Sequence, residues 1–407
     1  MSGLRVAVIG GGAAGQMAAI AAAQNGHRVT LLEKNEKLGK KLYITGKGRC
    51  NVTNDCGRDG FFSSVIRNPR FLYSAYAAFS ERDMMAFLEG HGCPVKVERG
   101  QRVFPSSDKS SDVQKALDRA LKAAGVAIRL NTDVREILIA DGAVSGVRTD
   151  RGIEPFDRVI LTTGGLSYPS TGSTGAGFEM AKALGHTVTD LHPSLVPLET
   201  VESWPFALSG ITLKNVRLTA KRGGKTIYSE QGEMLLTHFG VSGPLVLTAS
   251  AYIAEDPAGV QLYIDLKPAI PEEELHARLQ KLVQENSKKA VGGAFSGVLP
   301  TRLLDAVFTE ARIQPWAPAS SFTKEQRQAM VTALKAMPLT VKGPRPFSEA
   351  VITRGGISVK EVKPSTLESK LVSGLFLAGE ILDVDAFTGG FNLQIAWSTG
   401  ALAGGSI

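Results

Sequence analysis

Cysteine and long apolar runs are scarce in this chain. Its 407 residues include only three cysteines, too few for a disulfide scaffold, and no secretory signal is recognisable. An apolar run of about 20 residues is needed to cross a bilayer. The run from Pro244 to Ala254, among the longest here, ends at Glu255. We therefore expect a cytoplasmic protein without a membrane span, built from more than one domain.

Clustered positive charge and metal-ligand spacing are also missing. Lys and Arg number 46 against 39 Asp and Glu, which gives a net charge of +7. A nucleic-acid-binding domain would concentrate this excess on one face, but the densest basic run, residues 34–41, alternates with Glu and Gly. The six histidines lack the spacing of zinc ligands. We expect a small-molecule substrate and neither nucleic acid nor a metal as partner, while monomer and homodimer both stay open.

Glycine, by contrast, is abundant, with 44 residues. The first cluster follows an apolar, strand-like run at 4–9 and opens an alanine-rich helix, and a second strand at 28–32 ends at an acid. In the pattern G-x-G-x-x-G the glycines allow a tight turn, approach of a pyrophosphate and close helix packing, while the acid accepts hydrogen bonds from ribose. This order predicts a dinucleotide bound by Gly10, Gly12, Ala13, Ala14, Gly15 and Glu33.

Three later segments favour FAD over NAD. Apolar runs at 158–162 and 375–378 each lead into a glycine-containing turn. In one parallel sheet both turns would lie at the carboxyl ends of the strands, where ligands bind, and an extended FAD needs protein there. A helix that opens at Gly390 would stabilise negative charge on a reduced flavin. The residues of the two turns are Thr163, Gly164, Gly379 and Glu380.

Four longer motifs carry a family resemblance. They are GKGRCNVTN at 46–54, GEMLLTHFGVSGP at 232–244, GEILD at 379–383 and TGGFNLQ at 388–394. Together they resemble the BaiN-like (YhiN-like) family of NAD(P)/FAD-dependent oxidoreductases, which is similar in places to a bile-acid enone reductase and to an aminoacetone oxidase. The resemblance implies an α/β fold, with a Rossmann-like FAD-binding domain of the glutathione-reductase type. An insert with a small β-barrel and a helical subdomain would split that domain.

The resemblance also implies which residues hold the cofactor, beyond the first glycine cluster and Glu33. The pyrophosphate and the flavin edge are expected along Lys41, Gly48, Arg49, Cys50 and Asn51. The adenine is expected at the backbone of Val134. The ribityl chain and the pyrimidine end of the flavin are expected at Gly379, Glu380, Phe391, Asn392 and Leu393. The predicted set is completed by Lys34, Thr163, Gly164 and Gly390. Glu380 is a departure, since many related flavoenzymes outside this family have Asp at that position.

The middle of the chain loses the α/β rhythm after His186. Short runs at 212–220, 234–237 and 260–266 predict barrel-like strands. Helical periodicity follows at 271–286, 301–313 and 324–337. These changes in pattern set the predicted boundaries. They are 1–190 and 346–407 for the FAD domain, 191–270 and 336–345 for the barrel, and 271–335 for the helical subdomain.

No catalytic acid or base can be identified from the sequence. His238 and Asp383 are candidates, and Asp383 could either face the flavin or cap the final helix. Cys50 and Cys56 invite comparison with flavin disulfide reductases, but five residues separate them, where those enzymes have four. A second dinucleotide motif for NAD(P)H is absent, so this cosubstrate would bind transiently over the flavin.

These observations predict an FAD-dependent oxidoreductase. It would transfer a hydride between flavin N5 and a small organic substrate, and we place first an NAD(P)H-fed reductase of an activated C=C bond. Two alternatives stay open: a flavin amine oxidase of the aminoacetone type, and a non-catalytic flavin redox sensor.

Overall fold

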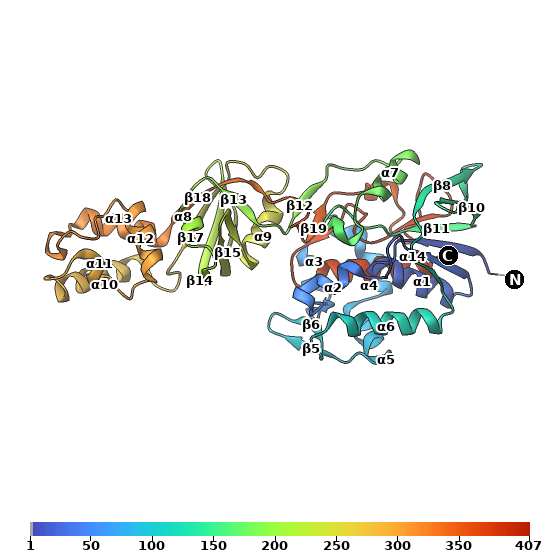
Figure 1. Ribbon diagram of the computed structural model, residues 1–407, viewed down its shortest axis with the longest axis horizontal. Coiled ribbons are helices and arrows are strands. Elements are labelled where there is room, and N and C mark those ends of the chain that lie inside the picture. The colour runs from blue at the N-terminus through green and yellow to red at the C-terminus, as the bar shows by residue number, and fades with distance from the viewer. Residues whose placement is uncertain (1–2) are drawn as a thin grey trace. The chain divides into compact units, whose positions relative to one another are not determined.

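The chain folds as two units in a computed structural model that describes residues 3–407 (Figure 1). The first unit comprises the residues up to Ser194 together with Phe347–Ile407, and the second comprises Leu195–Pro346. Among residues 3–407, no helix is both long and apolar enough to cross a membrane. The assignment of three functional domains to the chain stays a prediction.

A five-stranded parallel sheet forms the centre of the first unit, in the order β20-β11-β1-β2-β7. Its inner strands are short apolar runs buried on both faces, as is typical of parallel sheets. The strands predicted from their apolar runs are confirmed, and neighbours in this sheet come from both ends of the chain. The strands are β1 (Arg5–Ile9), β2 (Arg28–Leu32), β7 (Ala127–Arg129), β11 (Arg158–Leu161) and β20 (Leu375–Leu377).

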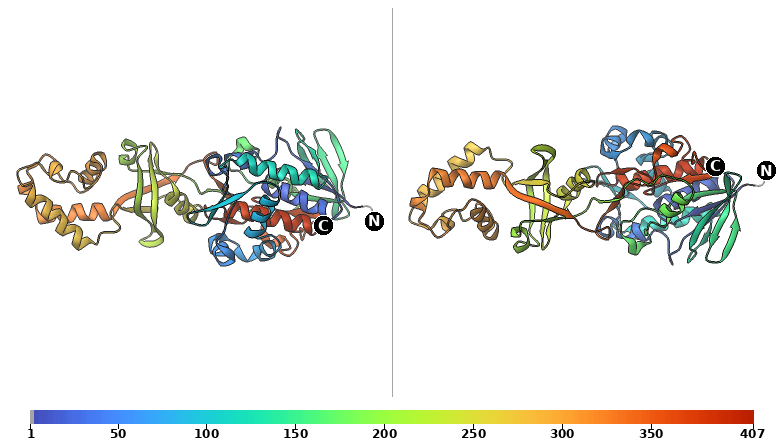
Figure 2. Two further views of the ribbon diagram at one scale, coloured as in Figure 1. Left: turned by 90° about the horizontal axis from the view of Figure 1, so that it is seen from below. Right: turned by 90° about the horizontal axis from the view of Figure 1, so that it is seen from above.

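Two helices from opposite ends of the chain, α1 (Ala13–Gln24) and α14 (Phe391–Gly405), pack against each other. Figure 2 shows them side by side as the blue and the red helix. Their backbones approach closely because glycine faces alanine: a Cβ added at Gly400 would lie 2.3 Å from the Ala14 carbonyl oxygen, and one at Gly404 would lie 2.2 Å from that of Ala18.

Smaller elements surround this sheet. Their strands are β3 (Thr53–Asn54), β6 (Arg102–Pro105) and β5 (Val95–Glu98) in one sheet, β8 (Val134–Ala140), β9 (Ala143–Thr149) and β10 (Gly152–Pro155) in another, and the pairs β4 (Val65–Arg67) with β21 (Asp385–Ala386) and β12 (His192–Ser194) with β19 (Ile352–Arg354). Their helices are α2 (Lys40–Ile44), α3 (Gly57–Ser64), α4 (Tyr73–Ala78), α5 (Glu81–Gly90), α6 (Ser110–Ala123) and α7 (Ala176–Ala183). Short 3₁₀ turns are η1 (Thr45–Gly48), η2 (Pro69–Leu72), η3 (Pro169–Thr171) and η5 (Val359–Glu361).

A closed six-stranded barrel forms the core of the second unit, in the order β13-β16-β15-β14-β17-β18. The predicted barrel is thereby confirmed, although β15 begins well before the strand predicted at 234–237. Its first half is mostly exposed and carries little apolar alternation, so the sequence pattern did not reveal it. The strands are β13 (Leu198–Thr200), β14 (Thr212–Arg222), β15 (Lys225–Thr237), β16 (Gly240–Ser242), β17 (Gln261–Asp265) and β18 (Met337–Pro344).

Helices follow the barrel strand β17 within the same unit (Figure 1). Apolar side chains of the barrel and of these helices belong to one continuous core, with Leu262 on one side and Leu304 and Leu334 on the other. The helices of this unit are α8 (Trp204–Ala207), α9 (Pro244–Ile253), α10 (Glu272–Glu285), α11 (Val291–Ala294), α12 (Thr301–Glu310), α13 (Lys324–Lys335) and the turn η4 (Ala319–Ser321).

The contact between α1 and α14 yields a stability prediction. We expect Gly400→Ala to lower the free energy of unfolding by about 1–3 kcal/mol, because its methyl group would overpack against the Ala14 carbonyl. Gly405→Ala is the matched control in the same helix, since a Cβ there meets no atom within 4 Å. Chemical denaturation of both variants checks this. Equal midpoints would show that the two helices can move apart without lowering the free energy of unfolding.

Candidate functional site

The turn after β1 leaves room where the motif predicts a pyrophosphate. A Cβ added at Gly15 would lie 1.8 Å from the Gly10 carbonyl oxygen, so the helix sits directly on the turn. A Cβ at Gly12 would meet nothing within 4 Å. Gly12 is the N-cap of α1, which has no side-chain cap and no acidic residue in its first turn. The positive end of the helix therefore faces open space beside the turn, which suits an anionic ligand.

Glu33 at the end of β2 is buried beside this turn. One carboxylate oxygen, Oε2, accepts a hydrogen bond of 2.7 Å from the Gly11 amide, and Oε1 accepts from the Asn35 amide at 2.8 Å. Thr132 donates its amide to the Glu33 carbonyl at 3.0 Å, which brings the start of β8, with the buried Val134, to the same end of the sheet. The predicted adenosine residues therefore lie in one neighbourhood.

Glu380, after β20, is held by a polar network that the sequence only half revealed. Lys41 Nζ lies 2.7 Å from Glu380 Oε2, and Ser167 Oγ donates to Oε1 at 2.8 Å. Lys41 also donates to Ser167 at 2.6 Å, and the Thr353 amide donates to Glu380 at 2.9 Å. Lys41 and Glu380 were predicted separately, and the structure joins them. Ser167 and Thr353 were missed, although Ser167 follows the predicted turn at 163–164.

The segment around Cys50 has an unusual backbone and buried polar atoms. Lys47 and Cys50 adopt positive φ angles of 57° and 58°, which cost energy for residues other than glycine. The Cys50 thiol is fully buried, and burial raises its pKa to about 12. Two buried oxygens, Asn51 Oδ1 and Thr163 Oγ1, have no hydrogen-bond partner among the described residues. Buried polar atoms normally have partners, so both are suited to contact a polar ligand.

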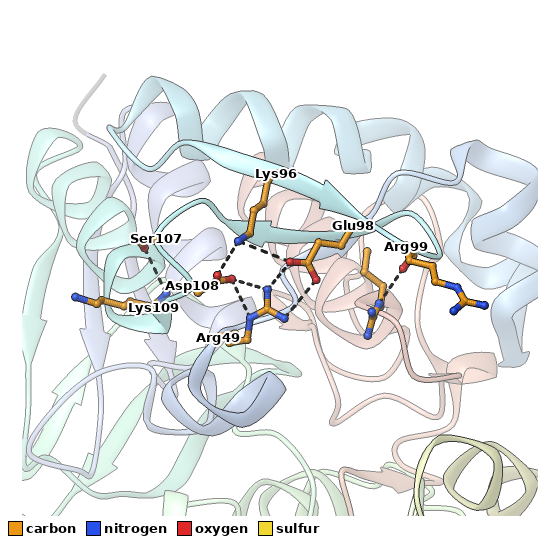
Figure 3. Close-up of polar contacts among 8 residues, drawn as sticks. Arg49, Lys96, Glu98, Arg99, Ser107, Asp108 and Lys109 are labelled. Carbon is orange, nitrogen blue, oxygen red and sulfur yellow. Dashed lines mark hydrogen bonds and ion pairs between the residues drawn. The ribbon is translucent and has the colours of Figure 1, made fainter. Parts of the chain in front are cut away.

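The Arg49 side chain points toward Glu98 in β5 and toward Asp108 (Figure 3). Its guanidinium lies 2.5 Å from Glu98 Oε1 and 2.5 Å from Asp108 Oδ1, and it stacks on the Phe104 ring at 4.1 Å. Lys96 adds a contact of 2.6 Å to Asp108. These groups are partly exposed, so each ion pair contributes little to stability, but together they anchor the Cys50 segment. Contact of Arg49 with FAD stays a prediction.

The start of α14 is tied to the segment that follows Cys50. A Cβ at Gly390, the N-cap, would lie 2.4 Å from the Thr53 carbonyl oxygen. Asn54 donates to the Gly389 carbonyl at 3.0 Å. The Asn392 side chain pairs with the backbone of Ala386, donating at 2.7 Å and accepting at 3.0 Å. The first turn of α14 contains no acidic residue and no side-chain cap, so its positive end suits an electron-rich group.

The other predicted cofactor residues are near these groups. Lys34 follows Glu33 and donates to Thr174 at 2.9 Å. Gly48 ends η1, Gly164 follows β11, and Gly379 follows β20 with its amide donating to Thr399 at 3.0 Å.

The two catalytic candidates are placed differently. Asp383 is buried, with Oδ1 2.5 Å from Arg67 Nε and its carbonyl accepting from Asn68 at 2.6 Å. This carboxylate is therefore already paired. His238 is exposed between β15 and β16 of the second unit, with its ring 5.0 Å from that of Phe239. A catalytic role for either stays a prediction.

The cysteines and acids give no alternative centre. Cys50, Cys56 and Cys93 are all free thiols, so the structure holds no Cys50–Cys56 disulfide. Within residues 3–407 no group of three or more His, Cys, Asp or Glu residues could hold a metal ion. The residues present instead fit a dinucleotide: an open helix N-terminus, a buried ribose-type acid and two unpartnered polar oxygens.

Comparison with known proteins places the chain in a family. The model of the HI0933-like protein Rossmann domain matches residues 4–406. A 3-dehydro-bile acid delta(4,6)-reductase of Clostridium scindens is 33% identical, over 98% of both chains. A ribosomal RNA dihydrouridine synthase of Escherichia coli is 29% identical, over 96% of this chain and 95% of that protein. One from Haemophilus influenzae is 30% identical, over 96% and 95%.

Solved structures resemble the fold at low sequence identity. The 3-ketosteroid-delta4-(5alpha)-dehydrogenase of Rhodococcus jostii RHA1 aligns over 99% of this chain and 96% of its own, with a TM-score of 0.55 and 16% identity. The 3-ketosteroid delta1-dehydrogenase of Sterolibacterium denitrificans aligns over 99% of both chains, with a TM-score of 0.55 and 12% identity. At these identities the likeness concerns the fold alone.

The position of Glu33 yields a binding prediction. We expect Glu33→Gln to weaken FAD binding about tenfold, because the carboxylate accepts charge-assisted hydrogen bonds that an amide cannot reproduce. Glu36→Gln is the matched control, since that side chain is 61% exposed and pairs with Lys40. Titration of the two apoproteins with FAD, followed by flavin fluorescence, checks this. Equal affinities would remove Glu33 from the binding site.

Proposed function

This chain belongs to the HI0933-like family of FAD-dependent oxidoreductases with a Rossmann domain, and we propose that it is an NAD(P)H-fed reductase of a C=C bond conjugated with a carbonyl group. When bound, FAD supplies hydride transfer. The substrate is a small organic molecule, and the chain's own residues bind and orient the cofactor.

The observation that carries this proposal is the chemistry shared by the relatives' names. A 3-dehydro-bile acid delta(4,6)-reductase acts on double bonds conjugated with a ring ketone, and a dihydrouridine synthase saturates a double bond conjugated with a ring carbonyl. Both reactions add a hydride and a proton to an electron-poor C=C bond. The similarity covers nearly the whole chain in both cases.

The residues that would hold FAD follow from the site. The amide groups at the start of α1, beside Gly12, would bind the pyrophosphate, and Glu33 would accept hydrogen bonds from the adenosine ribose. The pair of Lys41 and Glu380 would hold the ribityl chain. The start of α14 would hold the pyrimidine end of the flavin, where its dipole would stabilise the negative charge of the reduced ring.

The domain assignment belongs to the same proposal. The first unit is an FAD domain of the glutathione-reductase type, and residues 271–335 form a helical subdomain beside the barrel. No second G-x-G-x-x-G is present in the sequence, so NAD(P)H would bind transiently over the flavin.

A second substrate class is favoured by one observation. Two relatives that match 95% of their length are named ribosomal RNA dihydrouridine synthases. Uridine in RNA is therefore the second candidate substrate. The double bond of uridine and that of a cyclic enone would undergo the same reaction. The two substrates differ in size and charge, because uridine is part of an RNA chain.

Anaerobic titration of the flavin tests the proposed reaction. We expect NADPH or NADH to bleach the flavin absorbance, and a cyclic enone to restore it in the absence of oxygen. Dithionite is the control, because it shows that the bound flavin can be reduced. Bleaching by dithionite but by neither nucleotide would contradict the reductase assignment. Peroxide formation with an amine in a separate assay under air would then identify an oxidase. Restoration of the absorbance by uridine-containing RNA but by no enone would identify the second substrate class.

A further inference from the structure

The second unit contains a cavity of about 390 Å³. The cavity is formed where the start of β14 and the segment after β17 meet the beginning of α12. Its volume is within the range of pockets that hold small organic ligands. Its walls are formed by residues 211–216, 266–270, 299–300 and Leu303.

The walls combine an apolar surface with unpaired positive charge. Buried Leu213, Leu266 and Leu303 contribute the apolar part. The lining includes two lysines, Lys214 and Lys267, but no Asp or Glu. Within residues 3–407, neither lysine ammonium takes part in an ion pair or a side-chain hydrogen bond. An apolar cavity with two unpartnered cations complements an amphipathic anion.

The carboxylate closest in sequence to Lys267 already forms an ion pair with another lysine. Asp265 Oδ2 lies 2.6 Å from Lys335 Nζ, and Asp265 Oδ1 accepts from the Lys267 amide at 2.9 Å. Lys335 also donates to the carbonyls of Lys267 and Ile270, at 3.1 Å each. These bonds hold the backbone of Lys267 and Ile270, which line the cavity. They do not involve the Lys267 ammonium, which is left without a counter-ion.

The charged form of Lys267 is disfavoured in this position. Burial lowers its pKa, and the nearby Arg278 lowers it further. A bound anion would offset both effects. The start of α12 adds to the positive potential, because its first turn contains no acidic residue and no side-chain cap.

We propose that this cavity binds an amphipathic organic carboxylate of about ten carbons, with its alkyl body against Leu213, Leu266 and Leu303 and its carboxylate at Lys267 and Lys214. A volume of about 390 Å³ has room for a ligand of that size. None of the residues that we assign to FAD lies between Leu195 and Pro346. The inference therefore does not depend on the proposed reaction.

Isothermal titration calorimetry of the FAD-loaded protein with decanoate tests this inference. We expect saturable binding with one decanoate per chain, and no saturable binding of decyltrimethylammonium, which has the same alkyl chain and the opposite charge. Lys267→Gln should weaken decanoate binding about tenfold, because a charge-assisted hydrogen bond is lost. Lys225→Gln is the matched control, since Lys225 is exposed on the same barrel and outside the cavity lining.

A second variant keeps the test decisive if Lys267→Gln fails to fold. Lys214 is exposed, so Lys214→Glu should fold normally, and its reversed charge should weaken decanoate binding at least as much. Three results would overturn the inference: no saturable decanoate binding, equal binding of the cationic probe, or unchanged affinity in the folded lysine variants.

Discussion

The cofactor site depends on the close approach of three backbone segments around the first helix. Gly15 places α1 directly on the carbonyl of Gly10, and Gly400 lets α14 rest on the carbonyl of Ala14. With a side chain at either glycine, the helix would have to shift, because Cβ atoms essentially never approach another atom to within 3.0 Å. Both contacts hold the N-terminus of α1 at the end of β1, where the open space beside Gly12 lies. The dipole of the helix and the room for a pyrophosphate therefore arise from the same packing.

A second constraint joins parts of the chain that are far apart in sequence. The strands β1, β2, β11 and β20 are parallel neighbours, so their carboxyl ends meet along one edge. Glu33 and Glu380 follow two of these strands, and each is engaged by backbone amides. Glu380 also meets Lys41, from a segment 339 residues away. A partly buried ion pair of this kind fixes geometry more than it adds stability, which is what an extended cofactor requires.

Much of this arrangement could be predicted from local patterns. The order of apolar run, glycines, helix and acid predicted β1, α1 and β2, because each glycine is required by a close approach of local backbone. Short alternating runs predicted the barrel. Side-chain direction could not be predicted in the same way. Arg49 follows a glycine-rich turn, yet its guanidinium is held by Glu98 of the β5–β6 hairpin and by Asp108 of the segment after β6, and no motif marked either residue. The side-chain amide of Asn392 likewise donates to the Ala386 carbonyl. Such choices depend on tertiary partners and not on spacing.

The central claim is that this enzyme adds hydrogen to a conjugated C=C bond, and product analysis tests it most directly. The holoenzyme would be incubated with deuterium-labelled NADPH and a cyclic enone, and the product mass would be measured. Our account predicts a saturated ketone that has gained one deuterium and one hydrogen. Recovery of unchanged enone, while the flavin is still reduced by the nucleotide, would contradict it.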